Sequence, residues 1–198
     1  MQFVIASHNQ DKINELQRIF RTCHHDAVPY TELLSKKVFP AEGDTSYMEN
    51  ASQKALFISK YLNRYLVIAD DSGLFLTAHP NILGVRTARD LVNFPTPHEY
   101  AEYIIQLVHG RNRAFKMQTS IACAYHGRIL KVTNGTLEGQ IAITERGTAG
   151  EGFSQILIPE NSTKTLAQMT FAERYPYLTR ARAAEGLIQW LKENNNQY

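Results

Sequence analysis

Two adjacent carboxylates, Asp70 and Asp71, mark the stretch of the chain whose residue types point most directly to chemistry. They follow the apolar run 65–69, and Ser72 and Gly73 come directly after them. A strand that ends in acids can place negative charge in a ligand site, because ligands of open α/β sheets gather at the carboxyl ends of strands. Asp, Ser and Gly are also favoured turn residues. Taken alone, the stretch therefore predicts either an acidic site or a turn.

The segment from Ser7 to Lys12 joins an apolar strand expected over residues 3–6 to a helix expected over residues 13–20. The first backbone N–H groups of a helix have no partner within it, so a helix N-terminus is a natural anion site. Lys12 adds a positive charge there, and Asn9 suits the capping position. The turn lacks the glycines of a Walker loop, so an exposed lysine behind a capping asparagine is the alternative interpretation.

Two further acids, Glu42 and Glu49, precede the carboxylate pair and could converge with it on a metal ion. Mg²⁺ prefers oxygen ligands and keeps water and phosphate oxygens in its shell, so this donor set suits it. Glu49 has a second interpretation, because Ser46 and Glu49 have the spacing of a capping box for a helix expected over residues 47–62. Glu42 could equally be a solvated acid. Lys54, on the same helix, joins this group of charges.

A basic and aromatic group in the last third of the chain could hold a base. Arg174 and Arg180 flank the start of a final helix expected over residues 179–193, and Phe153 lies upstream. An arginine fork and an aromatic face can hold a purine ring and its exocyclic oxygen. Arg180 is the candidate donor to a purine O6. The alternative is a solvated helix face.

The composition is that of an ordinary soluble globular protein, with 198 residues, 43% of them hydrophobic and 20% charged, and a formal net charge of +2. This balance gives no field that favours a nucleic-acid or membrane partner. The two cysteines, Cys23 and Cys123, lie far apart, which excludes a disulfide framework and suits a reducing compartment. The apolar N-terminus lacks the basic lead of a signal peptide, so we expect a cytoplasmic protein.

The apolar patterns predict the elements that must position these residues. Thr96 and Glu99 form a capping box with Pro97 at the first helical position, and the helix that they start should end at Gly110. The other expected elements, in chain order, are a strand at 65–69, a turn, a returning strand at 74–78, a loop over 79–89, a strand from 115, a hairpin turn at 126–127 and a strand over 129–136.

In this order, the motifs resemble those of the inosine/xanthosine triphosphate pyrophosphatases, the Ham1-like non-canonical purine nucleotide pyrophosphatases. The ordered set is far more specific than any of its members. The resemblance implies a single domain over residues 1–198 with two lobes, a long mixed sheet flanked by helices, a central cleft and a homodimer. The matching stretches are Ala6–Lys12 with Glu15, Ser46–Ala51 with Lys54 and Ala55, Ala69–Leu74, Gly84–Arg89 and Gly135–Ile141.

The resemblance also implies roles for single residues. Asp71 matches the family's proposed general base and metal ligand, with Glu42 as a second acid near a Mg²⁺ cofactor. Ser7, Asn9 and Lys12 match the positions that bind the triphosphate. The residues that we expect to bind substrate in these motifs are Ser7, His8, Asn9, Lys12, Lys54 and Ser72.

The carboxyl third departs from the family pattern where the family grips the base. Residues 154–157 read Ser-Gln-Ile-Leu in place of Gly-Tyr-Asp-Pro, Arg174 stands in place of a lysine, and Thr179 stands in place of a histidine. The choice of base is therefore open. The candidate base-binding residues are Phe153, Arg174, Thr179 and Arg180.

We therefore predict a Mg²⁺-dependent hydrolase that converts a non-canonical purine nucleoside triphosphate, of the ITP, dITP or XTP type, to the monophosphate and pyrophosphate. Such a reaction serves nucleotide-pool sanitation. Two alternatives remain: an enzyme of altered base specificity, and a nucleotide-binding protein of the same fold without turnover.

Overall fold

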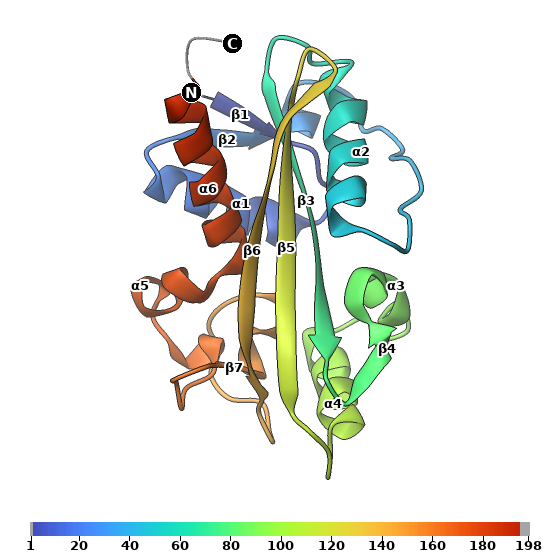
Figure 1. Cartoon of the computed structure of the whole chain (residues 1–198), viewed down its shortest axis with the longest axis vertical. Coiled ribbons are helices and arrows are strands. Elements are labelled where there is room, and N and C mark those ends of the chain that lie inside the picture. The colour runs from blue at the N-terminus through green and yellow to red at the C-terminus, as the bar shows by residue number, and fades with distance from the viewer. Residues whose placement is uncertain (1, 195–198) are drawn as a thin grey trace. The chain divides into compact units, whose positions relative to one another are not determined.

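The structure is a computed structural model that describes residues 2–194, and it is a mixed α/β protein (Figure 1). Within these residues, seven strands form one sheet in the order β2-β1-β3-β5-β6-β7, with β4 paired to β3. The predicted α/β class is confirmed. The strands are β1 (Gln2–Ile5), β2 (Asp26–Pro29), β3 (Leu66–Leu76), β4 (His79–Leu83), β5 (Ala114–Tyr125), β6 (Arg128–Ile141) and β7 (Leu157–Pro159). The helices are α1 (Gln10–Thr22), α2 (Tyr47–Ser59), α3 (Thr87–Asp90), α4 (Pro97–Leu107), α5 (Phe171–Arg174) and α6 (Thr179–Glu193).

The chain divides into two compact units. Of the described residues, the first unit contains 2–71, 119–135 and 180–194, and the second contains 72–118 and 136–179. The borders fall within β3, β5 and β6 and at the start of α6, so these elements contribute residues to both units.

In the first unit, β1 pairs in parallel with both β2 and β3. Helix α2 begins at the N-cap Ser46, whose hydroxyl accepts a hydrogen bond from the Glu49 N–H at 3.2 Å. Two small residues of α2, Ala51 and Ala55, lie in the apolar core with β1 and β3. Helix α1 has apolar residues at helical spacing, as predicted, and its buried residues are Ile13, Leu16, Ile19 and Phe20.

The second unit has an apolar core of its own, to which Leu74 of β3 and Ile104 of α4 contribute. Helix α4 begins with the predicted capping box. The Thr96 hydroxyl accepts from the Glu99 N–H, and the Glu99 carboxylate accepts from the Thr96 N–H. Pro97 occupies the first turn. Strong local signals of this kind position the helix correctly.

The predicted turn at Asp70–Gly73 is wrong, because β3 runs without interruption from Leu66 to Leu76. The backbone stays extended, and the side chains of both acids contact cationic or amide groups. Gly73 serves a close backbone approach instead of a turn. A Cβ at this position would lie 2.0 Å from the Gly84 carbonyl oxygen.

The predicted loop over residues 79–89 is also wrong, because it contains β4, a 3₁₀ turn at Gly84–Arg86 and the start of α3. The buried Thr87 hydroxyl fixes this segment. It accepts a hydrogen bond from the Leu74 N–H at 2.9 Å and donates to the Gly84 carbonyl at 2.6 Å. The bond between Leu74 and Thr87, which lie 13 positions apart, leaves no periodic signal in the sequence.

Candidate active site

The turn between β1 and α1 presents the first N–H groups of a 13-residue helix. Asn9 is the N-cap, and its side-chain oxygen accepts a hydrogen bond from the Lys12 N–H at 3.1 Å. The Asn9 N–H donates in turn to the hydroxyl of the buried Ser7 at 3.2 Å. These bonds fix the turn in the form that an anion would meet at the helix N-terminus.

His8 lies in the same turn, and its ring contacts the loop after β2. Its Nε2 lies 2.5 Å from the hydroxyl of the buried Tyr30, and its ring centroid lies 4.7 Å from that of Phe39. Burial, with a further effect of the Lys36 charge, lowers the pKa of His8. The imidazole therefore favours its neutral form and holds the turn and the loop together.

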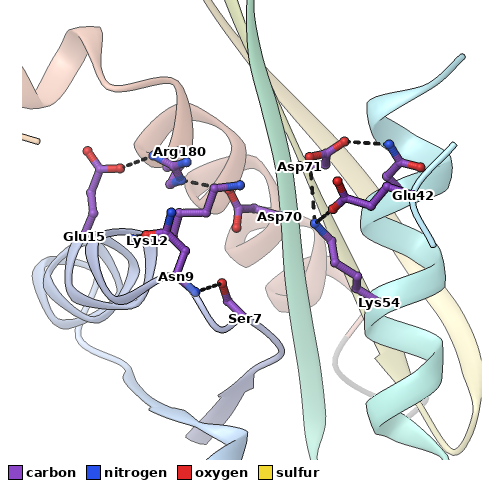
Figure 2. Close-up of polar contacts among 10 residues, drawn as sticks. Ser7, Asn9, Lys12, Glu15, Glu42, Lys54, Asp70, Asp71 and Arg180 are labelled. Atoms are coloured by element: carbon purple, nitrogen blue, oxygen red, sulfur yellow. Dashed lines mark hydrogen bonds and ion pairs between the residues drawn. The ribbon is translucent and has the colours of Figure 1, made fainter. Parts of the chain in front are cut away.

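On one side of β3, Asp70 is the centre of a cluster of four charges (Figure 2). Its Oδ2 lies 3.2 Å from Lys12 Nζ and 2.9 Å from Arg180 Nε. Arg180 Nη1 also donates to Glu15 Oε2 at 2.6 Å. Helices α1 and α6 and strand β3 thus contribute two cations and two anions, which we call the Asp70 cluster.

On the other side of β3, Asp71 belongs to a second cluster (Figure 2). The Asn50 side-chain amide donates to Asp71 Oδ2 at 2.9 Å. Lys54 Nζ lies 2.8 Å from Glu42 Oε1 and 3.8 Å from Asp71 Oδ1. The Asn50 side chain also bonds the backbone of Gly43 in both directions, at 2.8 and 3.1 Å. The four residues Glu42, Asn50, Lys54 and Asp71 form the Asp71 cluster, in which one amide ties the Glu42 loop to the carboxylate.

The pKa values of the two neighbouring carboxylates shift in opposite directions. Burial opposes the ionisation of Asp70, but the charges of Lys12, Arg180 and Lys54 outweigh it and lower the pKa of Asp70. Burial raises the pKa of Asp71, and the Lys54 charge and the Asn50 hydrogen bond offset only part of that effect. Neighbouring groups whose pKa values are pushed apart are typical of functional sites.

Glu42 and Asp71 are well placed to hold a cation, because both already contact one, the Lys54 ammonium. Mg²⁺ commonly takes one or two carboxylates and completes its shell with water and phosphate oxygens, so this pair fits it. Across residues 2–194, no group of three or more His, Cys, Asp or Glu side chains is arranged to hold a metal ion. Glu49, the other candidate acid, accepts a hydrogen bond from the Thr45 hydroxyl at 3.2 Å.

The structure brings Lys12, at the N-terminus of α1, to Asp70 of β3, and Lys54 of α2 to Asp71. These contacts agree with the order of motifs in the sequence. The Ham1 family model matches residues 3–190. The chain belongs to the Ham1 family.

Curated and solved relatives cover nearly the whole chain. A dihydroneopterin triphosphate diphosphatase of Limosilactobacillus reuteri is 43% identical over 191 residues, which are 96% of this chain and 98% of the relative. A dITP/XTP pyrophosphatase of Bacillus subtilis is 29% identical over 192 residues, 96% of each chain. The structure of the Staphylococcus aureus Ham1 protein matches with a TM-score of 0.82 at 29% identity, covering 98% of this chain and 100% of that one.

Four residues that the Ham1 motifs mark as substrate-binding belong to the second unit: Ser72, Phe153, Arg174 and Thr179. Arg174 is buried, and its Nη1 donates to the Met169 carbonyl at 3.0 Å. The Phe153 ring packs edge-on against Tyr100 at 5.1 Å between centroids. Both side chains thus take part in the packing of their own unit, and their contact with a base stays a prediction.

Two members of the clusters, Asn50 and Glu15, received no role from the sequence, although both stand in the Ham1 motifs. The sequence contains no sign of the role of Asn50. Its burial, at 1% exposed, and its bonds to Asp71 and to the backbone of Gly43 are visible only in the structure. The sequence groups Asp70 with the other acids, whereas the structure pairs it with Lys12 and Arg180.

Proposed function

We propose that this Ham1 protein is a Mg²⁺-dependent hydrolase that cleaves a non-canonical purine nucleoside triphosphate, of the ITP, dITP or XTP type, to the monophosphate and pyrophosphate. One observation carries the proposal: in one unit, adjacent residues of β3 join a lysine-bearing helix N-terminus, at Asp70, to a carboxylate of raised pKa, Asp71, which lies beside the Lys54–Glu42 ion pair. Relatives named as dITP/XTP pyrophosphatases support it. Their names are those of enzymes, which favours hydrolysis over binding without turnover.

The residues of the first unit divide the reaction between them. The N–H groups after Asn9 and the Lys12 ammonium would bind the phosphates. Lys54, which lies beside Asp71, provides another ammonium. Asp71 would orient a water molecule and take its proton as the water oxygen attacks the α-phosphorus. The bond from the α-phosphorus to the bridging oxygen breaks, and pyrophosphate leaves with that oxygen. Mg²⁺ held by Glu42 and Asp71 would supply neutralisation of the phosphate charge.

A second candidate substrate is dihydroneopterin triphosphate. The relative of that name is 43% identical to this chain, against 29% for the Bacillus subtilis dITP/XTP pyrophosphatase. The departures at residues 154–157 and at Thr179 fall where the family grips the base, so the ring bound here can differ from a purine. Both candidates carry a triphosphate, and the same phosphate-binding residues serve either.

A substrate panel tests the proposal. Purified protein with Mg²⁺ would be given ITP, dITP, XTP, the common nucleoside triphosphates and dihydroneopterin triphosphate, and pyrophosphate and monophosphate would be quantified. We expect both products in equal amounts from at least one substrate other than the common nucleotides, and the kcat/KM ratios rank the rings. Chelation of Mg²⁺ should abolish turnover, and added Mg²⁺ should restore it. Failure to release pyrophosphate from any of them contradicts the proposal.

We also propose the cytoplasmic homodimer that the family resemblance implies. Within residues 2–194, neither Cys23 nor Cys123 forms a disulfide, which fits a reducing compartment. No helix within residues 2–194 has the length and apolar character needed to cross a membrane. Light scattering on the purified protein would give the mass of the assembly, and a monomer at micromolar concentration would contradict the dimer.

A further inference from the structure

Residues 33–46, which we call the Glu42 loop, lie between a 3₁₀ turn and α2 and contain no helix or strand. Such a segment is only as fixed as the contacts that its residues make with the elements around it. At the α2 end of the loop, the Asn50 amide bonds the backbone of Gly43 in both directions, at 2.8 and 3.1 Å. Glu42 is therefore tied to the Asp71 cluster through its neighbour as well as through its own ion pair.

The hydroxyl of Tyr30 holds the other end of the Glu42 loop. Tyr30 is fully buried, and its oxygen accepts a hydrogen bond from the Lys37 N–H at 2.9 Å. Phe39 follows two residues later, and its ring lies 5.8 Å from the Tyr30 ring and 6.0 Å from that of Phe57 on α2, centroid to centroid. A phenol in the core thus gives this end of the loop a fixed point.

His8 reaches the same hydroxyl from residues 6–9, which join β1 to α1 and which we call the phosphate turn. Its Nε2 lies 2.5 Å from the Tyr30 oxygen, and its ring packs against Phe39. The Tyr30 oxygen already accepts from Lys37, so its own proton is available to the imidazole nitrogen, with the Lys37 carbonyl a more distant acceptor at 3.4 Å. The phosphate turn and the Glu42 loop therefore share one buried hydroxyl.

We propose that His8 is a positioning residue: through the Tyr30 hydroxyl it fixes the Glu42 loop relative to the phosphate turn. Glu42 lies between the two fixed points of the loop, which are residues 37–39 and Gly43. One point leads to the phosphate turn and the other to the Asp71 cluster, and all these residues belong to one unit. The proposal rests on the proposed function in one respect, namely that Glu42 and the phosphate turn serve the same reaction.

Amide hydrogen exchange in the protein without ligands reads this link directly. In Tyr30→Phe, the Lys37 N–H loses its acceptor, and its exchange rate should rise about 10-fold, as expected for the loss of one hydrogen bond. His8→Ala leaves the hydroxyl in place but removes the group that fixes it. Exchange over residues 37–43 should then rise about threefold or more. Wild-type exchange of these residues in His8→Ala would overturn the proposal.

Turnover gives a second readout, because a displaced Glu42 should weaken the use of Mg²⁺. Tyr30→Phe leaves His8 itself in the phosphate turn, yet it should raise the Mg²⁺ concentration for half-maximal rate about 3-fold to 10-fold, as should His8→Ala. His8→Gln keeps an amide near the position of Nε2 and should recover part of the loss. A wild-type Mg²⁺ requirement in Tyr30→Phe would overturn the link through the hydroxyl.

The double variant shows whether His8 and Tyr30 act as one link. Its effect on exchange and on the Mg²⁺ requirement should be clearly smaller than the product of the two single effects, and effects that multiply would overturn the proposal. Tyr65→Phe, beside the same core, and His109→Ala, at an exposed position, are the matched controls and should leave both readouts unchanged. If the wild-type protein hydrolyses no substrate, the proposed function fails, while the link is still tested by exchange.

Discussion

The two faces of β3 treat neighbouring carboxylates in opposite ways. Asp70 meets Lys12 and Arg180 and has a lowered pKa, whereas Asp71 meets Lys54 and the Asn50 amide and has a raised one. Consecutive side chains of a strand point to opposite faces, so two adjacent acids can enter separate environments. A single strand thus supplies one carboxylate that stays ionised and anchors cations and one that is prepared to accept a proton.

The two adjacent residues therefore have different tasks: Asp70 holds cations in place, and Asp71 is the candidate proton acceptor. An ionised anchor suits the binding of a triphosphate by Lys12, because its charge is fixed over the working pH range. A carboxylate whose pKa is raised by burial is the better proton acceptor for water, since general bases work best when their pKa approaches the operating pH. Substitutions at the two positions should therefore impair different properties of the protein, stability at Asp70 and turnover at Asp71.

The largest effect is expected from Asp71→Asn. The amide keeps the shape of the side chain and removes the proton acceptor, so kcat should fall about 10²-fold to 10⁴-fold, the usual contribution of a general base. The melting temperature should stay at or above that of the wild type, because a carboxylate disfavoured by burial is replaced with a neutral group. A variant that turns over at the parent rate would move the base to another residue.

Asp70→Asn should mainly lower the stability of the protein, whereas Asp71→Asn should mainly lower kcat. Lys12 and Arg180 would lose the anion that they share, and breaking a buried ion pair from one side costs about 3 kcal/mol or more. Urea unfolding at neutral pH measures this loss. Asp26→Asn, at an exposed position of β2, is the control and should change the free energy of unfolding by less than about 0.5 kcal/mol. Equal stability of Asp70→Asn and the wild type would contradict the anchoring role.

Asn50→Ala should weaken catalysis without removing it. The substitution deletes the amide that holds Asp71 and the backbone of Gly43, and the loss of such a supporting partner typically lowers activity about 10-fold to 100-fold. The Mg²⁺ concentration needed for half-maximal rate should also rise, because Glu42 lies on the released loop. Asn14→Ala, on the exposed face of α1, should leave both values unchanged. An unaltered Asn50→Ala enzyme would mean that Asp71 needs no support.

The smallest effect is a pair of opposite pH slopes in stability, measured without Mg²⁺. The folded pKa of Asp70 is below its unfolded value of about 3.9, so its stabilising contribution is complete above that pH and is lost as the pH falls through the folded value. Asp71 has a raised folded pKa, so its contribution is present below pH ~3.9 and is lost as the pH rises. From neutral pH toward pH 3, the stability difference between the wild type and Asp70→Asn should shrink, while the wild type should gain on Asp71→Asn. Parallel curves would contradict the opposite shifts.

Elements with strong local signals could be predicted from the sequence. Helix α4 has a full capping box, α1 has a buried stripe at helical spacing, and the hairpin between β5 and β6 has positive φ at His126 and Gly127, as its turn residues suggested. In each case the determining contacts lie within a few residues of one another. Periodicity and capping chemistry record such contacts directly.

The path of β3 and the partners of its acids could not be predicted, because they depend on distant residues. Asp-Asp-Ser-Gly has turn chemistry, but in the sheet β3 lies between β1 and β5 and stays extended through these residues. The Asp70 side chain accepts from Arg180, 110 positions away in the chain. Arg180 itself stands in a motif associated with the base, and its local sequence contains no sign of Asp70 or Glu15. The Ham1 motif order singled out Lys12, Lys54 and Asp71, and the structure places each of them in an ion pair at β3. The division of these pairs between two sides of one strand required the structure.

Hydrolysis in ¹⁸O-labelled water tests the proposed reaction most directly. Attack on the α-phosphorus by a water molecule held at Asp71 places the label in the monophosphate and leaves the pyrophosphate unlabelled, which mass spectrometry of the two products would show. Label in the pyrophosphate would mean attack at the β-phosphorus and would contradict the assignment of the Asp71 cluster to the α-phosphorus.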